Sequence, residues 1–120
     1  MTLRRFAAAV LLVLGAAGFS GTAAPAHAAT GYDRCPDGHF CLFSAADGGG
    51  TIAYFRLGST DLRLQNIDGQ AYAIWNRTGR YWDGFTEYNY TGGIIFRVQP
   101  GHRGSVPADV ATQVHSVKAV

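Results

Sequence analysis

The chain has 120 residues, of which 48% are hydrophobic, with ten basic side chains, eight acidic side chains and two cysteines. Because two of the arginines lie in an N-terminal leader, the remainder carries eight basic and eight acidic residues and no basic cluster. We therefore expect no nucleic-acid partner and no anionic membrane partner, since both require a basic surface. Outside the leader the length fits one domain.

The segment from Met1 to Ala28 predicts a secretory signal peptide. Arg4 and Arg5 precede an apolar run that reaches about Phe19, and the small-x-small sequence AHA ends at Ala28. The run is shorter than the ~20 residues that cross a bilayer, and glycines interrupt it. We expect cleavage after Ala28 and a mature domain over residues 29–120. That domain is expected to be secreted, extracellular, free of membrane and monomeric.

Both cysteines, Cys35 and Cys41, follow the leader, after a short lead-in at residues 29–34 that looks loose. An even cysteine count on an exported chain predicts a disulfide. A zinc site fits poorly, because C-x5-C is not a zinc spacing and no second pair exists. We expect the Cys35–Cys41 disulfide to stabilise the N-terminal edge of the domain.

Short apolar runs separated by turn residues fill the rest of the chain. The expected strands, in chain order, cover residues 40–43, 51–55, 71–75, 81–88, 94–98 and 114–117. They are rich in Val, Ile, Phe, Tyr and Trp, and glycine-rich or asparagine-rich turns lie between them. The pattern predicts an all-β sandwich or barrel, with one helical turn as the alternative within residues 107–117. Trp75 lies on an alternating strand and is expected in the core.

The chain also repeats itself. Phe43 and Phe85 are each followed seven residues later by a glycine, at Gly50 and Gly92. Some thirty residues after each ring comes another strand, and these two strands are separated by almost the same number of residues as the two rings. Two units of about forty residues are too few for a solenoid. They predict two four-stranded Greek keys packed face to face.

The stretch FTEYNYTG holds two rings, Phe85 and Tyr90, that can pack together only if the chain between them folds back in a tight hairpin. Gly92 would then supply a backbone conformation that a side chain forbids. In the first unit Gly48 stands where the second ring is expected. The predicted structural-corner residues are Phe43, Gly50, Phe85, Tyr90 and Gly92.

This aromatic-x4-aromatic-x-Gly spacing resembles the signature corner of the βγ-crystallin Greek key. Five pieces of the chain, this corner included, resemble actinobacterial crystallin-fold peptidase inhibitors, at residues 35–43, 75–79, 85–92, 100–101 and 116–117. The founding member of that family inhibits thermolysin-like metalloproteinases. The resemblance implies a βγ-crystallin-like sandwich of two Greek-key units, an extracellular protease as partner, and inhibition by a surface loop.

Inhibitory loops present a rigid, substrate-like strand whose entropy was lost in advance. In the founding inhibitor a second disulfide in the C-terminal half holds this loop, whereas this chain has no cysteine after Cys41. The second corner is aromatic and tight, and thermolysin-like enzymes favour apolar side chains in their main pocket. The resulting hypothesis places the protease contact at Tyr88, Asn89, Tyr90, Thr91 and Gly92.

No residue pattern predicts an enzyme. The histidines lack metal-binding spacing, the disulfide would consume both thiols, and no G-x-S-x-G motif occurs. Asp83 and Glu87 are expected to form a solvated surface pair. The N-x-Thr sequences at Asn76 and Asn89 are expected to form turns.

Two alternatives to inhibition stay open. One is a calcium-binding or calcium-stabilised βγ-crystallin-type module, for which Asp68 and Asp109 are the residues to test. Both lie in degenerate acidic stretches, so no cofactor is expected, and the other interpretation makes them turn formers. The second alternative is a secreted killer-toxin-like or cell-wall-binding protein of this fold without inhibitor activity.

Overall fold

The computed structural model describes residues 30–120, so the predicted signal peptide lies outside the described residues. The strands are β3 (Phe40–Ala45), β4 (Gly49–Phe55), β5 (Gly58–Ser59), β6 (Ala73–Asn76), β7 (Trp82–Phe85), β8 (Ile94–Val98), β9 (Arg103–Ser105) and β10 (Ser116–Ala119). The helical turns are η3 (Gly31–Arg34), η4 (Ala46–Gly48), η5 (Leu62–Gln65) and α1 (Ala108–Ala111). Within this part of the chain no helix is long and apolar enough to span a membrane.

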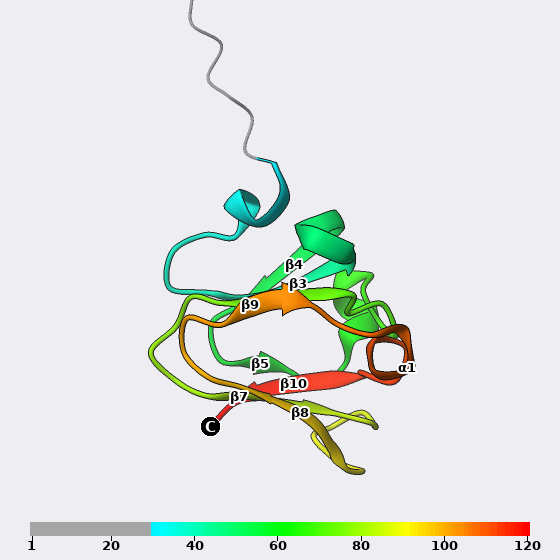
Figure 1. Cartoon of the computed structure of the whole chain (residues 1–120). Helices are drawn as coiled ribbons and strands as arrows, with labels where there is room; N and C mark the ends of the chain where they lie inside the picture. The colour runs from blue at the N-terminus through cyan, green and yellow to red at the C-terminus, as the bar shows by residue number, and fades with distance from the viewer. Residues whose placement is uncertain (1–29) are drawn as a thin grey trace, which may run out of the picture.

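The strands form two antiparallel four-stranded sheets, which Figure 1 shows as two stacked layers with α1 at one end. The strand orders are β4-β3-β6-β9 and β5-β10-β7-β8. The all-β prediction is therefore confirmed, and α1 lies within residues 107–117, where the sequence allowed one helical turn. The strand expected over residues 81–88 is shorter in the structure, because β7 ends at Phe85, where its pairing with β8 also becomes irregular.

The two predicted four-stranded Greek-key units are present, and they exchange strands between the two sheets. The third strand of each unit crosses to the other sheet: β5 pairs with β10 at Ser59, and β9 pairs with β6 at Gly104. These exchanged strands are two and three residues long and carry little apolar character, which is why the sequence pattern did not predict them. The exchange brings both units around a shared core.

The main core lies between the sheets and is centred on Trp82, which is fully buried. Its ring stacks on Phe40 at a centroid distance of 4.5 Å. The expectation that Trp75 occupies this core is wrong, because its strand neighbour Ile74 faces the core instead. Trp75 is half-buried on the opposite face of the sheet, where it packs against Tyr32 in a smaller cluster.

Asn76 ends strand β6 in a turn in which both polar atoms of its side chain form hydrogen bonds. Its side chain is fully buried, and its amide nitrogen donates to the carbonyls of Arg80 (2.8 Å) and Val98 (3.1 Å). Its amide oxygen accepts from the backbone N–H of Thr78 at 3.0 Å, and the Thr78 hydroxyl in turn accepts from the indole N–H of Trp82. The first N-x-Thr sequence is therefore a turn whose asparagine is closed to solvent.

The expectation that Asp83 lies at the solvated surface is wrong, since it is only 3% exposed. Both of its carboxylate oxygens accept from the Arg97 guanidinium, at 2.7 and 2.8 Å. This two-point bond is the main reason that the pKa of Arg97 is raised. The pair joins two neighbouring strands, because Asp83 on β7 lies opposite Arg97 on β8.

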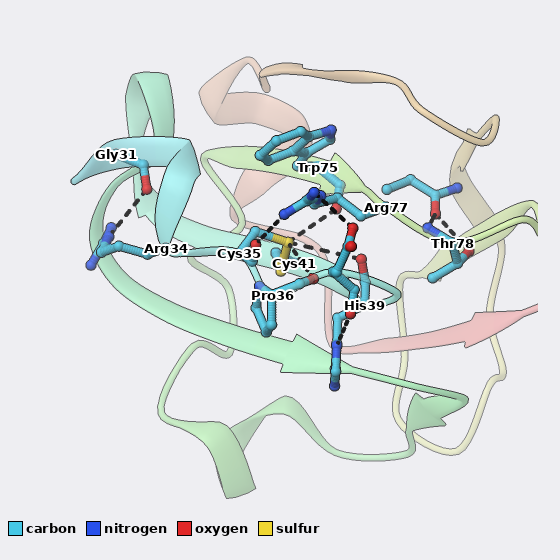
Figure 2. The surroundings of a disulfide bond; sticks show 11 residues. Gly31, Arg34, Cys35, Pro36, His39, Cys41, Trp75, Arg77 and Thr78 are labelled. Carbon is cyan, nitrogen blue, oxygen red and sulfur yellow. Dashed lines mark hydrogen bonds and ion pairs between the residues drawn. A yellow bond between two sulfur atoms is a disulfide. The ribbon is translucent and has the colours of Figure 1, made fainter. Parts of the chain in front are cut away.

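The Cys35–Cys41 disulfide is present and fixes the N-terminal segment against the sheet (Figure 2). Arg77 reinforces it by donating to the Cys35 carbonyl at 2.8 Å and to the Asp37 carboxylate at 2.7 Å. The same guanidinium lies over the Trp75 ring, 4.5 Å from its centroid. The N-terminal segment is thus held both covalently and by an arginine.

Removing this disulfide with Cys35→Ser and Cys41→Ser together is expected to lower the free energy of unfolding by about 2 kcal/mol, the loop-closure value for a ring of this size. Urea denaturation of the oxidised parent and the double variant measures the difference. The fully reduced parent is the control and should match the variant. A double variant as stable as the oxidised parent would show that non-covalent contacts such as those of Arg77 are enough to hold the segment.

Candidate functional site

The second corner folds back as a tight hairpin between β7 and β8. The rings of Phe85 and Tyr90 lie 5.8 Å apart, and Gly92 adopts a left-handed φ of +76°. A Cβ atom at Gly92 would collide with the Thr86 hydroxyl. That hydroxyl accepts a hydrogen bond from the backbone N–H of Gly93 at 2.9 Å, so the glycine permits the contact that closes the hairpin.

The first corner closes in the same way, but its second ring comes from a residue outside the corner. Ser44 accepts from the backbone N–H of Thr51 at 2.7 Å, as Thr86 does from Gly93 in the second corner. The missing ring comes from Tyr32 in η3, whose centroid lies 5.3 Å from that of Phe43. Gly48 leaves room for it, since a Cβ there would lie 2.6 Å from the Tyr32 backbone nitrogen. Nothing in the local sequence pattern marks Tyr32 for this role.

Two consecutive residues of the second corner, Asn89 and Tyr90, have a left-handed φ of +60° without being glycine. Such conformations cost on the order of 1–3 kcal/mol each and persist only where surrounding contacts enforce them. The Asn89 N–H donates to the Thr60 carbonyl at 2.8 Å, and the Tyr90 N–H donates to the Ser116 hydroxyl at 3.1 Å. Ser116 is fully buried and donates in turn to the Glu87 carbonyl at 2.6 Å.

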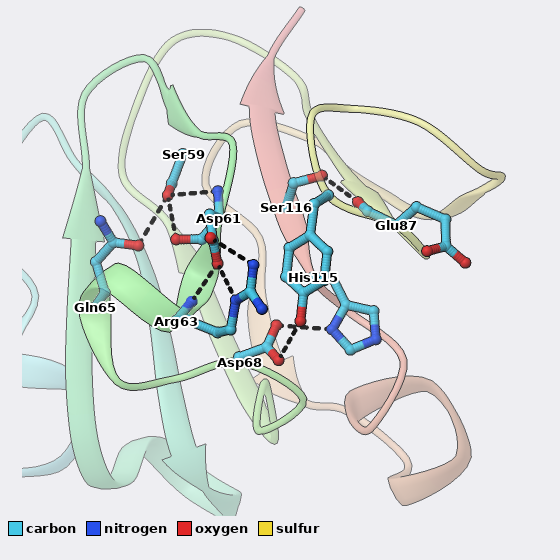
Figure 3. A network of polar contacts seen from close by, with 9 residues as sticks. Ser59, Asp61, Arg63, Gln65, Asp68, Glu87, His115 and Ser116 are labelled. Carbon is cyan, nitrogen blue, oxygen red and sulfur yellow. Dashed lines mark hydrogen bonds and ion pairs between the residues drawn. The ribbon is translucent and has the colours of Figure 1, made fainter.

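Figure 3 shows the polar cluster around Asp61, Arg63, Asp68 and His115, which holds the ring of Tyr88. The Tyr88 hydroxyl donates to one oxygen of Asp68 at 2.8 Å, and the other oxygen lies 2.7 Å from Nδ1 of His115. The Arg63 guanidinium lies 4.1 Å from the centroid of the Tyr88 ring and forms a two-point pair with Asp61. The cluster joins the corner to the η5 region of the first unit.

The five predicted contact residues therefore divide into two groups. Tyr88 and Tyr90 turn their rings inward and are half-buried, whereas Asn89, Thr91 and Gly92 are exposed. Ile94, the first residue of β8, follows them and is 54% exposed. The corner thus displays backbone and small side chains on an anchored aromatic base, with one apolar side chain beside it.

The two calcium candidates lie in different surroundings. Both carboxylate oxygens of Asp68 are taken by Tyr88 and His115, while Asp109 is exposed in the first turn of α1. Among residues 30–120 no group of three or more His, Cys, Asp or Glu side chains could hold a metal ion. A polar hollow of about 310 Å³ beside Asp68 is also lined by Arg63, whose positive charge opposes a cation.

The bond to Asp68 is the main reason that the pKa of Tyr88 is raised above its ordinary value of 10.0. A raised folded-state pKa means that the stabilisation is present below pH 10 and lost as pH rises through the folded-state value. Tyr88→Phe should therefore be less stable than the parent at pH 8, and the difference should shrink towards pH 11. Urea denaturation across this range measures it, and a difference that stays constant with pH would contradict the assignment.

Comparisons with known proteins identify the family and agree with the fold. Residues 28–97 match the family model described as peptidase inhibitor family I36. A βγ-crystallin from Ciona intestinalis is similar in structure at 21% identity and a TM-score of 0.60, covering 69% of this chain and 100% of its own. A βγ-crystallin domain from Clostridium beijerinckii has 18% identity and a TM-score of 0.59, covering 68% and 95%. No curated protein matches the sequence.

Proposed function

Because the chain belongs to peptidase inhibitor family I36, and is a protease inhibitor with a βγ-crystallin fold and not an enzyme, we propose that its target is an extracellular thermolysin-like metalloprotease. The contact is made by the second corner, Tyr88 to Gly92. The metalloprotease assignment rests on the sequence resemblance, and the choice of loop rests on the geometry of the corner.

One observation carries the choice of loop: the exposed backbone at Asn89 and Tyr90 has two consecutive left-handed φ angles, and hydrogen bonds to distant parts of the fold hold it there. The positive φ angles of Asn89 and Tyr90 are enforced by Thr60 and Ser116, which belong to other parts of the fold. A loop ordered before binding loses little conformational entropy in the complex. The corner therefore meets the main physical requirement of an inhibitory loop without a second disulfide.

Ile94 supplies the apolar side chain that such a target would accept. It is 54% exposed at the start of β8, two residues after Gly92, and its strand neighbour Ile95 is half-buried. An exposed branched apolar side chain next to a rigid turn suits an apolar protease pocket. Burial of such a side chain contributes roughly 1.5–3 kcal/mol.

Titration against thermolysin, following cleavage of a peptide substrate, tests the proposal. Calcium is kept in excess, so that stripping metal from the protease is not mistaken for inhibition. We expect stoichiometric loss of activity, and Ile94→Asp should weaken inhibition by at least about tenfold. Leu57→Asp, at another exposed apolar residue, is the matched control and should inhibit like the parent. No inhibition at large excess would overturn the metalloprotease assignment.

Export is part of the proposal, with the segment from Met1 to Ala28 acting as the signal peptide. Expression of the whole chain in a bacterial host and N-terminal sequencing of the protein in the medium tests it. The expected product begins at Ala29. Retention of the whole chain in the cell with an intact Met1 would contradict it.

A further inference from the structure

Asp68 projects from a fixed loop of the first unit. The preceding residue, Ile67, is fully buried, and its N–H donates to the Leu62 carbonyl at 3.2 Å. The following residue, Gly69, donates its N–H to the Val114 carbonyl at 3.1 Å. Anchored on both sides, the Asp68 carboxylate has a defined position relative to the second sheet.

That carboxylate connects three separate parts of the chain. One oxygen accepts the Tyr88 hydroxyl of the second corner at 2.8 Å, and the other lies 2.7 Å from Nδ1 of His115, which precedes β10. The rings of Tyr88 and His115 also lie 5.1 Å apart, and Arg63 lies over the Tyr88 ring. Tyr88 is thus restrained by its hydroxyl and by its ring, immediately before the left-handed pair of residues.

The first corner lacks this arrangement. When the two units are aligned on their corner rings, Phe43 with Phe85, Tyr88 corresponds to Ala46, and the later-strand alignment of the repeat pairs Asp68 with Ala111. The first corner nevertheless closes, with Gly50 at a φ of +69° and its serine hydroxyl bonded to the backbone beyond the glycine. A carboxylate–tyrosine bond is therefore not needed to form a corner of this fold.

We infer that Asp68 is a positioning residue for the second corner, and that its bond to Tyr88 keeps the backbone from Asn89 to Gly93 in the conformation that contacts the protease. The expected effect on protease binding rests on the proposed function, whereas the geometry of the bond between Asp68 and Tyr88 does not. Asp68 does not touch the target, since Tyr88 lies between it and the exposed backbone. Its role is to order the corner before binding.

Amide hydrogen exchange on the protein tests the inference without any protease. In Asp68→Ala, exchange at Asn89, Tyr90 and Gly93 should be faster by about three- to tenfold, the effect of losing one hydrogen bond. Amides of β3 should be unchanged. Asp109→Ala, at the other candidate aspartate, is the matched control and should leave the corner as protected as in the parent.

The Tyr88→Phe variant gives a second test of the inference. It should loosen the same amides, and the double variant should loosen them no more than Asp68→Ala alone, because Asp68→Ala already breaks the bond that Tyr88→Phe removes. Unchanged corner exchange in Asp68→Ala, or full additivity in the double variant, would overturn the inference. Inhibition constants measured on the same variants should rise in parallel with exchange. If the parent inhibits no metalloprotease, the proposed function fails while the exchange result still decides the role of Asp68.

Discussion

Replacing Trp82 by alanine is expected to lower the free energy of unfolding by about 3–5 kcal/mol, the range for removing a large buried aromatic ring. Trp82 is fully buried, stacks on Phe40 at 4.5 Å and lies 6.5 Å from the ring of Phe55. Its indole N–H also donates to the Thr78 hydroxyl at 3.0 Å, so the turn that ends β6 loses a bond as well. Urea denaturation monitored by far-ultraviolet circular dichroism measures the change.

The adjacent residue is the control for this prediction. Tyr81 is an aromatic residue next to Trp82 in the chain, but it is 48% exposed. Tyr81→Ala should therefore change stability by no more than about 0.5 kcal/mol, as is usual for surface substitutions. Equal losses at both positions would show that the core is not centred where the structure places it.

The fold class could be predicted because its signals are local. Alternating apolar residues with turn residues between them indicate strands wherever they occur, and the spacing from Phe43 to Gly50 recurs from Phe85 to Gly92. Each signal involves a few neighbouring residues, so no tertiary information is needed. The prediction of two Greek keys followed from the repetition.

The arrangement of the strands in the two sheets could not be predicted from local sequence patterns, because it depends on tertiary contacts. Alternation shows that Ile74 and Trp75 face opposite ways, but it does not say which face of the sheet is covered by the other sheet. The larger side chain was assigned to the core, whereas the structure places Ile74 there. The exchange of β5 and β9 between the sheets could not be predicted either, because strands of two or three residues have no measurable periodicity.

In the candidate site, too, the local features could be predicted from the sequence and the long-range contacts could not. The hairpin could be recognised from Phe85, Tyr90 and Gly92, since their spacing is a local pattern. The groups that hold it, Asp68 and Ser116, lie far along the chain from the corner residues that they bind. Such distant contacts arise from tertiary packing, which no local sequence pattern specifies.

These contacts explain how the corner is ordered without a second covalent link. A disulfide would restrict the unfolded chain, whereas the bonds to Thr60, Ser116 and Asp68 act only in the folded state. The order of the corner is therefore coupled to the integrity of both sheets. A substitution that blocks the closed hairpin should affect stability and inhibition together.

Gly92→Ala is the substitution that tests this coupling most directly. Its φ of +76° is unfavourable for alanine, and the added Cβ would lie 2.7 Å from Cγ of Glu87 and collide with the Thr86 hydroxyl. We expect a loss of about 2–3 kcal/mol in the free energy of unfolding, from left-handed strain together with the loss of the bond between Thr86 and Gly93. Urea denaturation measures this loss, and the thermolysin titration measures the accompanying loss of inhibition.

Gly93→Ala is the matched control, one residue further along the same exposed turn. A Cβ atom there would meet no other atom within 4 Å. Alanine at such a position also reduces the freedom of the unfolded chain, so this variant should be as stable as the parent or up to about 1 kcal/mol more stable. Opposite effects at adjacent glycines can arise only from the closed hairpin geometry. If Gly92→Ala is tolerated as well as Gly93→Ala, the corner is not closed in solution and cannot act as a loop ordered before binding.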